Sequence, residues 1–375
     1  MIEPFFAYVR HSSNHCLVSV STVVNILEQY LYVKKNVFGC AILLSLLALL
    51  TGCNQKTIEQ VSGPTMGTSY QVKYIAGDSS VSQSEVAQRV DAVLADINQR
   101  MSTYIPTSEL MQFNQAPTGE VFKLSNDIVT LVALSQEISE MSGGRYDVTV
   151  GPLVNLWGFG PDKRPTTIPS DEALAEAFDK VGYQHVKADK QASTLLKVKP
   201  VFVDLSSIAK GYAVDKVAEA LDTMGINSYL VEVGGELKIK GEKAAGVPWR
   251  IGIEEPALGQ RKASAAIEAP GKGIATSGDY RNYYEIDGQR FSHTINPLTG
   301  RPITHKLASV TVVHPSVAMA DGLATMLMVV GYPEGMALAK EHDLAAYFIV
   351  KEGEGFTSYL SPSFKPFLAP STREE

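Results

Sequence analysis

A carboxylate and a hydroxyl four residues apart form the most chemically suggestive pair in the chain. Asp321 and Thr325 occur in the run Ala320–Thr325. In a helix, this spacing places both side chains on one face. Their oxygens are hard ligands that suit Mg²⁺, which keeps further positions for water or a substrate phosphate. A structural explanation is also open, in which Thr325 bonds back along the helix and Asp321 lies near its N-terminal end. On spacing alone, the structural explanation is favoured.

A predicted strand-to-helix junction at Val203–Gly211 supplies a second candidate site. Helix N-termini attract phosphate through their free N–H groups and the helix dipole. Ser206 and Ser207 could cap this helix, and Lys210 could contact an anionic ligand. The alternative, in which Ser207 is only a cap and Lys210 is solvated, is equally compatible with the residues.

Two further segments combine a turn with a polar or flexible residue. Gly234 and Gly235 separate two strand-like halves in Glu232–Glu236. They permit close approach of a ligand, although a bulge or a hairpin turn is the simpler interpretation. His293 precedes a tight turn within Ser292–Gly300 and could bind flavin or phosphate, or move a proton. A lone histidine is more often structural.

Met66 and Tyr104 are candidates for packing against a planar ring system. Met66 is followed by Gly67-Thr68, and Tyr104 ends the run Ser102–Tyr104. Taken as isolated features, methionine and tyrosine are more often part of a hydrophobic core. None of the seven histidines has a spacing typical of metal ligands.

Hydrophobic periodicity predicts the helices and strands that must position these residues. Ser82 and Glu85 form a capping box, followed by a helical apolar stripe of Val86, Val90, Val93, Ile97 and Met101. Further predicted helices are Asn126–Ser142, Ile208–Met224 and Val317–Val330. Predicted strands are Ser69–Ala76, Leu195–Val198, Val201–Leu205, Ser228–Val233, Trp249–Ile253, Ser264–Glu268, Ala308–Val313 and Ala345–Val350. The Gly- and Pro-rich segment Asp147–Pro169 is expected to be irregular.

The order of these elements predicts an α+β fold. Strands occur in runs rather than in strict β-α-β alternation. No predicted strand is followed by Gly-x-Gly-x-x-Gly, so a Rossmann fold is not favoured. The 375 residues carry a net charge of −7 without Lys/Arg tracts, which argues against a nucleic-acid partner. The three cysteines are Cys16, Cys40 and Cys53, so neither a disulfide framework nor a cysteine zinc site is expected after residue 53.

The N-terminal segment has the pattern of an export signal. Lys34 and Lys35 precede an apolar run from Val37 to Leu50, which is shorter than the roughly 20 residues that a membrane-spanning helix needs. The run Leu50–Cys53 resembles a lipobox, which predicts lipidation of Cys53. We therefore expect a leader over 1–52, a lipidated cysteine and tether over 53–63, and a single folded domain over 64–370.

Two details of this leader lead to separate hypotheses. The signal peptide occupies about 33–52, and residues 1–32 fit a leader poorly. Val33 stands where an initiator is expected, so the true start codon could lie there. Asn54, rather than aspartate, follows the cysteine, which favours the outer membrane under the usual lipoprotein sorting pattern.

Taken together, the motifs resemble those of the FAD:protein FMN transferases, the ApbE-like lipoproteins, over residues 63–368. The segments that carry the resemblance are Thr65–Thr68, Ser102–Tyr104, Asp147–Leu153, Val154–Gly160, Asp204–Tyr212, Gly234-Gly235, Ser277-Gly278, His293–Pro297 and the pair Asp321 and Thr325. The resemblance implies a T-fold-like α+β architecture, with mixed or antiparallel sheets, packed helices and FAD bound in a cleft.

The resemblance also implies a set of site residues. FAD contacts would come from Met66, Tyr104, Arg145, Tyr146, Asp147, Asp204, Lys210 and Ile295. His293 and Asp321 would act in catalysis, and Mg²⁺ would be held by Asp321, Thr325 and the backbone carbonyl of Ser207. Ala324 stands where some relatives have another oxygen-bearing residue, so water replaces that ligand here or the ion binds more weakly.

The implied activity is Mg²⁺-dependent transfer of FMN from FAD to a threonine or serine hydroxyl of an acceptor protein, with release of AMP. The implied acceptors are redox-protein subunits facing the periplasm, reached by a membrane lipoprotein on the same side. Two alternatives use the same residues: an FAD pyrophosphatase that yields FMN and AMP, and a non-catalytic flavin-binding lipoprotein. The residues do not separate Mg²⁺ from Mn²⁺, because both take oxygen ligands.

Overall fold

The computed structural model describes residues 57–77, 81–160, 165, 167–256, 262–279, 283–286 and 289–370. The predicted leader, Cys53 and the first part of the predicted tether lie outside the described residues. All described residues belong to one unit, Lys56–Glu375. Within the described part of the chain, no helix is both long and apolar enough to cross a membrane.

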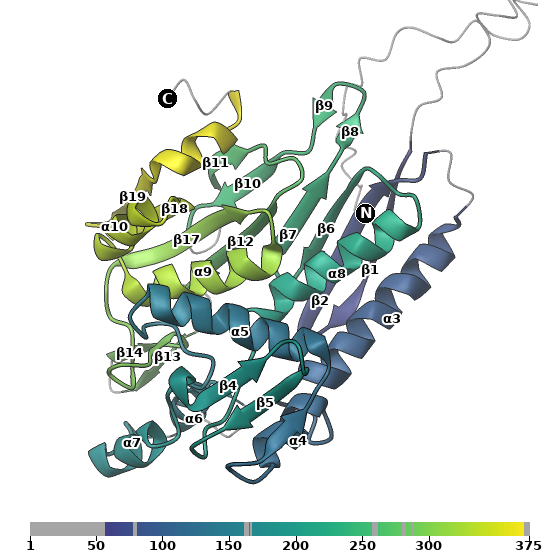
Figure 1. The fold of residues 1–375 in the computed structure, drawn as a ribbon. Coiled ribbons are helices and arrows are strands. Elements are labelled where there is room, and N and C mark those ends of the chain that lie inside the picture. The colour runs from purple at the N-terminus through teal and green to yellow at the C-terminus, as the bar shows by residue number, and fades with distance from the viewer. Residues whose placement is uncertain are drawn as a thin grey trace, which may run out of the picture. The chain divides into compact units, whose positions relative to one another are not determined.

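An eight-stranded sheet organises this unit (Figure 1). Its order is β1-β2-β6-β7-β12-β17-β18-β19, and every neighbouring pair is antiparallel. The strands are β1 (Ile58–Thr65), β2 (Thr68–Ile75), β6 (Tyr229–Val233), β7 (Glu236–Lys240), β12 (Gly273–Gly278), β17 (Leu307–His314), β18 (Ala345–Glu352) and β19 (Gly355–Leu360). The predicted α+β class is confirmed.

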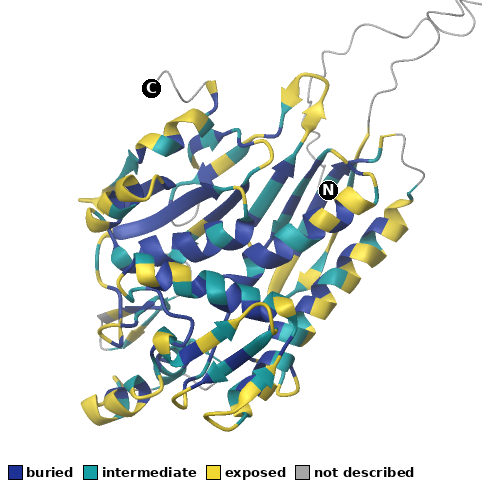
Figure 2. Ribbon diagram, viewed as in Figure 1, coloured by how far each residue is buried: buried dark blue, intermediate teal, exposed yellow. Residues whose placement is uncertain are grey.

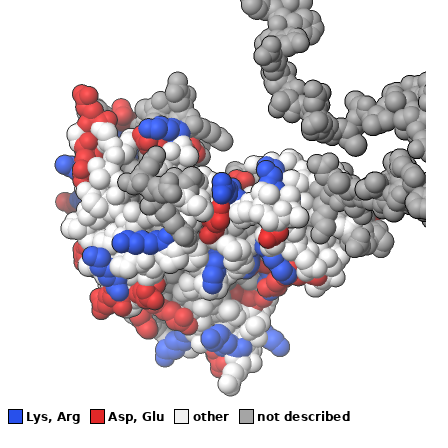
Figure 3. All heavy atoms as spheres, turned by 90° about the horizontal axis from the view of Figure 1, so that it is seen from above, with Lys and Arg blue, Asp and Glu red and all other residues white. Residues whose placement is uncertain are grey.

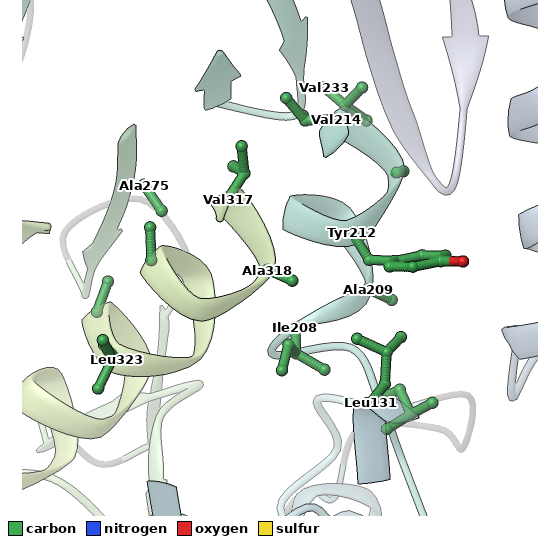
Figure 4. Packing of buried hydrophobic residues seen from close by; sticks show 14 of the residues in the cluster. Leu131, Ile208, Ala209, Tyr212, Val214, Val233, Ala275, Val317, Ala318 and Leu323 are labelled. Atoms are coloured by element: carbon green, nitrogen blue, oxygen red, sulfur yellow. The ribbon is translucent and has the colours of Figure 1, made fainter. Parts of the chain in front are cut away.

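Helices cover one face of the sheet. They are α3 (Gln83–Met101), α8 (Ala209–Thr223) and α9 (Val317–Val330), and α5 (Asn126–Met141) packs on α9. Figure 2 shows that the buried residues of these helices gather on the sides facing the sheet and one another. In the main core, Val317 and Ala318 of α9 lie next to the start of α8, where Ile208 is buried (Figure 4).

The opposite face of the sheet carries a second core. Side chains alternate along each strand, so Ile274 faces this second core whereas Ala275 faces the helices. The cover consists of β10 (Ile251–Glu254), β11 (Ala263–Ile267) and the C-terminal 3-10 helix η2 (Pro362–Phe367), with Trp249 and Phe364 buried beneath it. The central strands are therefore buried on both faces, and every residue of β17 except the last is buried, including the polar Ser309 and Thr311.

Two smaller parts complete the described unit. One is a three-stranded sheet of β3 (Val121–Lys123), β5 (Thr194–Lys197) and β4 (Val186–Asp189), with α4 (Glu109–Gln115). The other, which we call the aromatic satellite, contains α6 (Gly151–Leu156), α7 (Asp171–Phe178), β13 (Tyr283–Ile286) and β14 (Gln289–Ser292). The rings of Trp157 and Phe291 stack there at 5.3 Å, in a core separate from the other two. The remaining elements are α10 (Glu334–Glu341), η1 (Tyr183–His185), β8 (Glu242–Ala244), β9 (Val247–Pro248), β15 (Ile295–Asn296) and β16 (Arg301–Pro302).

Helix ends follow the signals that predicted them. The capping box is complete, since the Ser82 side chain accepts from Glu85 N–H and the Glu85 side chain accepts from Ser82 N–H. The predicted bounds of α9 are correct at both ends. One detail of the first helical stripe is wrong, because Leu94 is buried in the core whereas Val93 is only partly buried.

The strand predicted at Val201–Leu205 is wrong. This segment pairs with no strand, because a side chain satisfies its backbone instead. The Asn114 amide accepts a 2.8 Å hydrogen bond from Val203 N–H and donates one of 2.8 Å to the Val203 carbonyl. Asp204 N–H then donates to the Val148 carbonyl at 2.7 Å. Val201, Val203 and Leu205 are buried. The backbone of this segment is held by the Asn114 side-chain amide rather than by hydrogen bonds to a neighbouring strand.

Two boundaries also differ from the predictions. The segment Asp147–Pro169 is not irregular throughout, since α6 begins at Gly151 with a proline in its first turn, where the missing N–H has no cost. Strand β1 begins at Ile58, inside the predicted tether, and pairs with β2 along its whole length. The folded part therefore starts before Pro64.

Gly211 sets the spacing between α8 and α9. A Cβ atom built on Gly211 would lie 2.3 Å from the carbonyl oxygen of Val317 and 2.8 Å from the Cβ of Asp321. These distances are too short for any side chain, so only glycine allows the two helix backbones to approach this closely.

We expect Gly211→Ala to lower the free energy of unfolding by about 1–3 kcal/mol, because the added methyl group must force two packed backbones apart. A decrease in stability would be informative, because replacing glycine with alanine inside a helix normally stabilises the helix by about 1 kcal/mol. Urea denaturation measures the change. Gly252→Ala is the matched control, because its Cβ would meet Ala263 at an ordinary 3.6 Å. Equal stability of the two variants would contradict the packing argument.

Candidate functional site

Asp321 lies where α9 contacts the first turn of α8. The residue is only 4% exposed, and its Oδ2 accepts a 2.9 Å hydrogen bond from the Gly211 N–H. Burial raises the pKa of Asp321, against the opposing effects of the Lys210 charge and the Gly211 hydrogen bond. A buried carboxylate fixed by a backbone donor is therefore the centre of the candidate site.

Thr325 lies one turn after Asp321 on the same helix. Its Oγ1 is 3.4 Å from the Oγ of Ser277, which belongs to β12. In the described part of the chain, Thr325 makes no hydrogen bond back along α9, so the structural explanation of the Asp321 and Thr325 spacing is not supported for the threonine. Two hydroxyls and one carboxylate thus come together from α9 and β12.

Lys210 forms a buried ion pair beside this centre. Its Nζ lies 2.5 Å from Oε1 of Glu236, and the two side chains are 30% and 4% exposed. Burial, and then the charge of Asp321, raise the pKa of Glu236 to about 8. Although burial opposes it, the charges of Asp321 and Glu236 raise the pKa of Lys210. The prediction that Lys210 is merely solvated surface is therefore excluded.

Tyr146 and Ser207 bring a loop against the same region. The Tyr146 hydroxyl and the Ser207 Oγ are 2.9 Å apart, and burial raises the pKa of Tyr146 well above its usual range. A Cβ built on Gly322, the neighbour of Asp321, would lie 3.5 Å from the Tyr146 hydroxyl. Ser207 does not cap α8, since Ile208 occupies the N-cap position and no side-chain cap bond forms. Ser206 does not cap it either, because its hydroxyl donates to Asp204.

The oxygens around Asp321 are chemically suited to a hard divalent cation. Among the described residues, no group of three or more His, Cys, Asp or Glu side chains could hold a metal ion. A cation at Asp321 would therefore depend on hydroxyl, carbonyl and water oxygens besides this carboxylate. The hydroxyls of Thr325, Ser277 and Ser207 belong to the three segments that meet here. Ala324 is buried and adds no oxygen.

Three of the predicted flavin contacts lie near the start of α8, namely Met66, Tyr104 and Asp204. Tyr104 is 63% exposed, and its pKa is raised by partial burial and by the charge of Asp204. Met66 sits at the turn between β1 and β2 with a φ of +47°, a strained conformation for a side chain of this size. The next residues of that turn approach Lys210, since a Cβ built on Gly234 would lie 2.9 Å from Thr68 Cγ2 and 3.1 Å from Lys210 Cδ.

Other predicted residues lie in different surroundings. His293 and Ile295 belong with the aromatic satellite, where the His293 ring is 6.3 Å from the Phe159 ring and Ile295 is buried. Arg145 makes a 2.8 Å ion pair with Glu334 at the first turn of α10.

Asp147 acts as a structural connector. Its Oδ1 accepts hydrogen bonds from the N–H and hydroxyl of Thr149, at 2.7 and 2.6 Å, and its Oδ2 accepts from the Tyr183 N–H at 2.8 Å. Burial raises the pKa of Asp147, and these hydrogen bonds oppose the increase. The carboxylate thus ties the loop before α6 to the loop before β4.

We expect Asp147→Ala to lower the free energy of unfolding by about 2–4 kcal/mol, because it leaves buried donors unpaired. Urea denaturation without FAD measures this loss. Asp189→Ala is the matched control, since the Asp189 carboxylate also accepts two backbone N–H bonds, but at an exposed turn. Unchanged stability of Asp147→Ala, combined with weaker FAD binding, would show instead that Asp147 acts mainly as a ligand contact.

Sequence reasoning missed Glu236 and left Ser277 without a role. Glu236 stands in the Gly234-Gly235 segment, which was considered only for its glycines. The hairpin turn favoured there is confirmed, since Val233 pairs with Glu236 across the two glycines. A carboxylate directly after such a turn is the signal that could have identified it, because the turn fixes where the side chain points.

Comparisons with known proteins agree with this arrangement. The model of the ApbE family matches residues 66–348. The FAD:protein FMN transferase of Vibrio cholerae is 48% identical over 329 residues, which cover 87% of this chain and 98% of that protein. The FAD:protein FMN transferase of Klebsiella pneumoniae is 43% identical over 342 residues, covering 88% and 97%.

Solved structures give the same result at the level of the fold. The flavinyl transferase ApbE of Pseudomonas stutzeri, in its apo form, has a TM-score of 0.77 at 42% identity and covers 84% of this chain and 98% of that one. The flavin transferase ApbE from Vibrio cholerae has a TM-score of 0.77 at 46% identity, covering 83% and 100%. Because its sequence and its fold both match over most of their length, the chain belongs to the ApbE family.

Proposed function

We propose that this chain transfers FMN from FAD to a threonine or serine hydroxyl of an acceptor protein and releases AMP. The observation that carries the proposal is the buried Asp321, with Lys210 beside it, in a chain 48% identical to a named FAD:protein FMN transferase. A family name alone does not identify a reaction, but a centre of oxygen ligands and a positive charge suits phosphoryl transfer.

The bond changes define what the site must do. The acceptor oxygen forms a bond to the phosphorus of the FMN half, while the bond from that phosphorus to the bridging oxygen of the pyrophosphate breaks. AMP leaves with the electron pair, and the acceptor proton passes to a base, for which His293 stays a prediction. Negative charge grows on the leaving phosphate, so a fixed positive charge such as that of Lys210 lowers the barrier.

A divalent cation is part of the proposal. Asp321, Thr325 and the Ser207 carbonyl would hold Mg²⁺, which would offset the charge of the pyrophosphate. The Gly211 N–H orients the Asp321 carboxylate for this purpose through one of its two oxygens. The Tyr146 hydroxyl, bonded to the Ser207 side chain, supports the segment that carries the Ser207 carbonyl.

A cavity lies just beyond the end of β12, the strand that carries Ser277. A cavity of about 410 Å³ includes Asp279, two residues beyond Ser277, together with Tyr283 and Arg290. The Arg290 guanidinium lies 4.1 Å from the centre of the Tyr283 ring. None of the predicted site residues lines this cavity, so we do not assign it to FAD. A cavity of about 860 Å³ at the ends of β2 and β7 contains none of the predicted site residues.

We further propose that the protein is a periplasm-facing lipoprotein with Cys53 as its anchor and one enzyme domain after it. Its acceptors would be redox subunits exposed on the same side of the membrane. Nucleic acid is not proposed as a partner, because the chain is acidic overall and positive and negative side chains are interspersed on the face shown in Figure 3.

The proposed activity predicts a mass change in the acceptor. The chain is incubated with FAD, Mg²⁺ and a redox-subunit domain, and the intact mass of that domain is measured. We expect the acceptor to gain the mass of one FMN. We expect no gain when EDTA is present during the incubation, because the cation is needed to offset pyrophosphate charge. Release of FMN and AMP without a gain would identify a pyrophosphatase. Intact FAD with every acceptor tested would indicate a flavin carrier.

Asp321→Asn connects that activity to the site. The amide oxygen can still accept the Gly211 hydrogen bond, whereas the charge is lost, so the fold is retained and we expect transfer to fall by at least about 100-fold. The control is Asp96→Asn, which removes an exposed carboxylate paired with Arg100 on α3. Full activity of Asp321→Asn would remove Asp321 from the mechanism.

The localisation proposal has its own test. We expect Cys53→Ser to move the protein from the membrane fraction to the soluble periplasmic fraction, because serine cannot carry the thioether-linked lipid. Immunoblotting of the fractions measures this, and Cys40→Ser is the control, since Cys40 lies within the predicted signal peptide. Retention of Cys53→Ser in the membrane at the wild-type level would contradict lipidation at this residue.

A further inference from the structure

Three charged side chains from three elements meet at the start of α8. Lys210 comes from α8, Glu236 from β7 and Asp321 from α9. Glu236 and Asp321 are both largely buried carboxylates. The structure shows the Lys210 ion pair with Glu236, at 2.5 Å, while Asp321 accepts from the Gly211 backbone. The lysine is thus bonded to the carboxylate that is not a predicted metal ligand.

Asp321 is the other carboxylate within reach of Lys210. Gly211, the residue after Lys210, donates its N–H to Asp321, so the backbone at Lys210 lies next to the Asp321 carboxylate. Although burial opposes it, the charge of Asp321 raises the pKa of Lys210. A partly buried ammonium group that loses its partner is attracted to a remaining carboxylate, so we expect Lys210 to turn to Asp321 if Glu236 is absent.

The sheet fixes Glu236 independently of Lys210. Glu236 opens β7 directly after the turn, and its backbone pairs with Val233 of β6. A Cβ built on Gly234 would lie 3.1 Å from Lys210 Cδ and 3.6 Å from Glu236 Oε2, so the lysine chain passes close to the turn. Oε2 is buried and has no hydrogen-bond partner among the described residues, whereas Oε1 holds the Lys210 ammonium group.

We propose that Glu236 is a positioning residue that holds the Lys210 ammonium away from Asp321 and so keeps the Asp321 carboxylate available to a divalent cation. This inference rests on the proposed function, because it concerns the same cation site. An ammonium bonded to Asp321 would compete with the cation for the same oxygen. An opposite charge beside a carboxylate weakens proton binding by about 10- to 1000-fold, and a metal ion meets the same competition.

The test is Mn²⁺ binding to the full chain without FAD, with the free ion measured by electron paramagnetic resonance. The proteins compared are the wild type, E236M, K210M and the double variant E236M/K210M. Methionine is similar in size to both residues and offers Lys210 no good acceptor. We expect E236M to weaken Mn²⁺ binding about tenfold or more, and the double variant to bind within about threefold of K210M. Thermal melting in EDTA verifies that each variant is folded.

Equal Mn²⁺ affinity of the wild type and E236M would overturn the inference. The same loss on replacing Glu236 with and without Lys210 would also overturn it, because Glu236 would then act on the ion directly. If E236M does not fold, the double variant decides, since an apolar replacement of a buried ion pair is usually tolerated. Weaker binding by the double variant than by the wild type would then overturn the proposal.

The same Mn²⁺-binding measurements give different results if the proposed function itself is wrong. In that case the wild type binds no Mn²⁺, or D321N binds it as well as the wild type does. Either result removes the cation site and the role of Glu236 together. Binding that is lost in D321N but unchanged in E236M removes only the role of Glu236.

Discussion

The close contact between α8 and α9 is the constraint on which the site depends. Because Gly211 has no side chain, its backbone reaches α9 and its N–H meets the Asp321 carboxylate at 2.9 Å. The same contact places Lys210 one residue before the hydrogen bond and Thr325 one turn after it. A wider spacing would move all of these groups relative to one another, so the geometry of the candidate site depends on the packing of the two helix backbones.

The sheet adds the second half of this arrangement. Both of its faces are buried, which fixes β6 and β7 and the two-glycine turn between them. The Glu236 carboxylate therefore occupies a set position next to a helix that also has a set position. Buried charges of this kind cost stability unless each has a partner, and they occur where function requires them. One oxygen of Glu236, Oε2, is buried without a hydrogen-bond partner among the described residues.

Sequence alone predicted most of the fold and part of the site. The capping box and the apolar period located α3 and α9 well, because both signals are local. Val201–Leu205 was predicted as a strand because an apolar run does not show what pairs with it, here the Asn114 side chain. The resemblance implied that Asp321 and Lys210 belong to one site, and the structure brings them together. Glu236 was missed because only the three-dimensional turn directs it toward Lys210.

The Gly211–Asp321 hydrogen bond joins residues 110 positions apart in the chain. Contacts of such sequence separation form late, after the loop between them has closed at an entropic cost. The stretch from β1 to α8 already contains Lys210, yet until α9 docks it lacks both the carboxylate and the threonine beside it. Under the proposed mechanism, a nascent or truncated chain that ends before α9 lacks the carboxylate expected to hold the cation, so we expect no FMN transfer before α9 has docked.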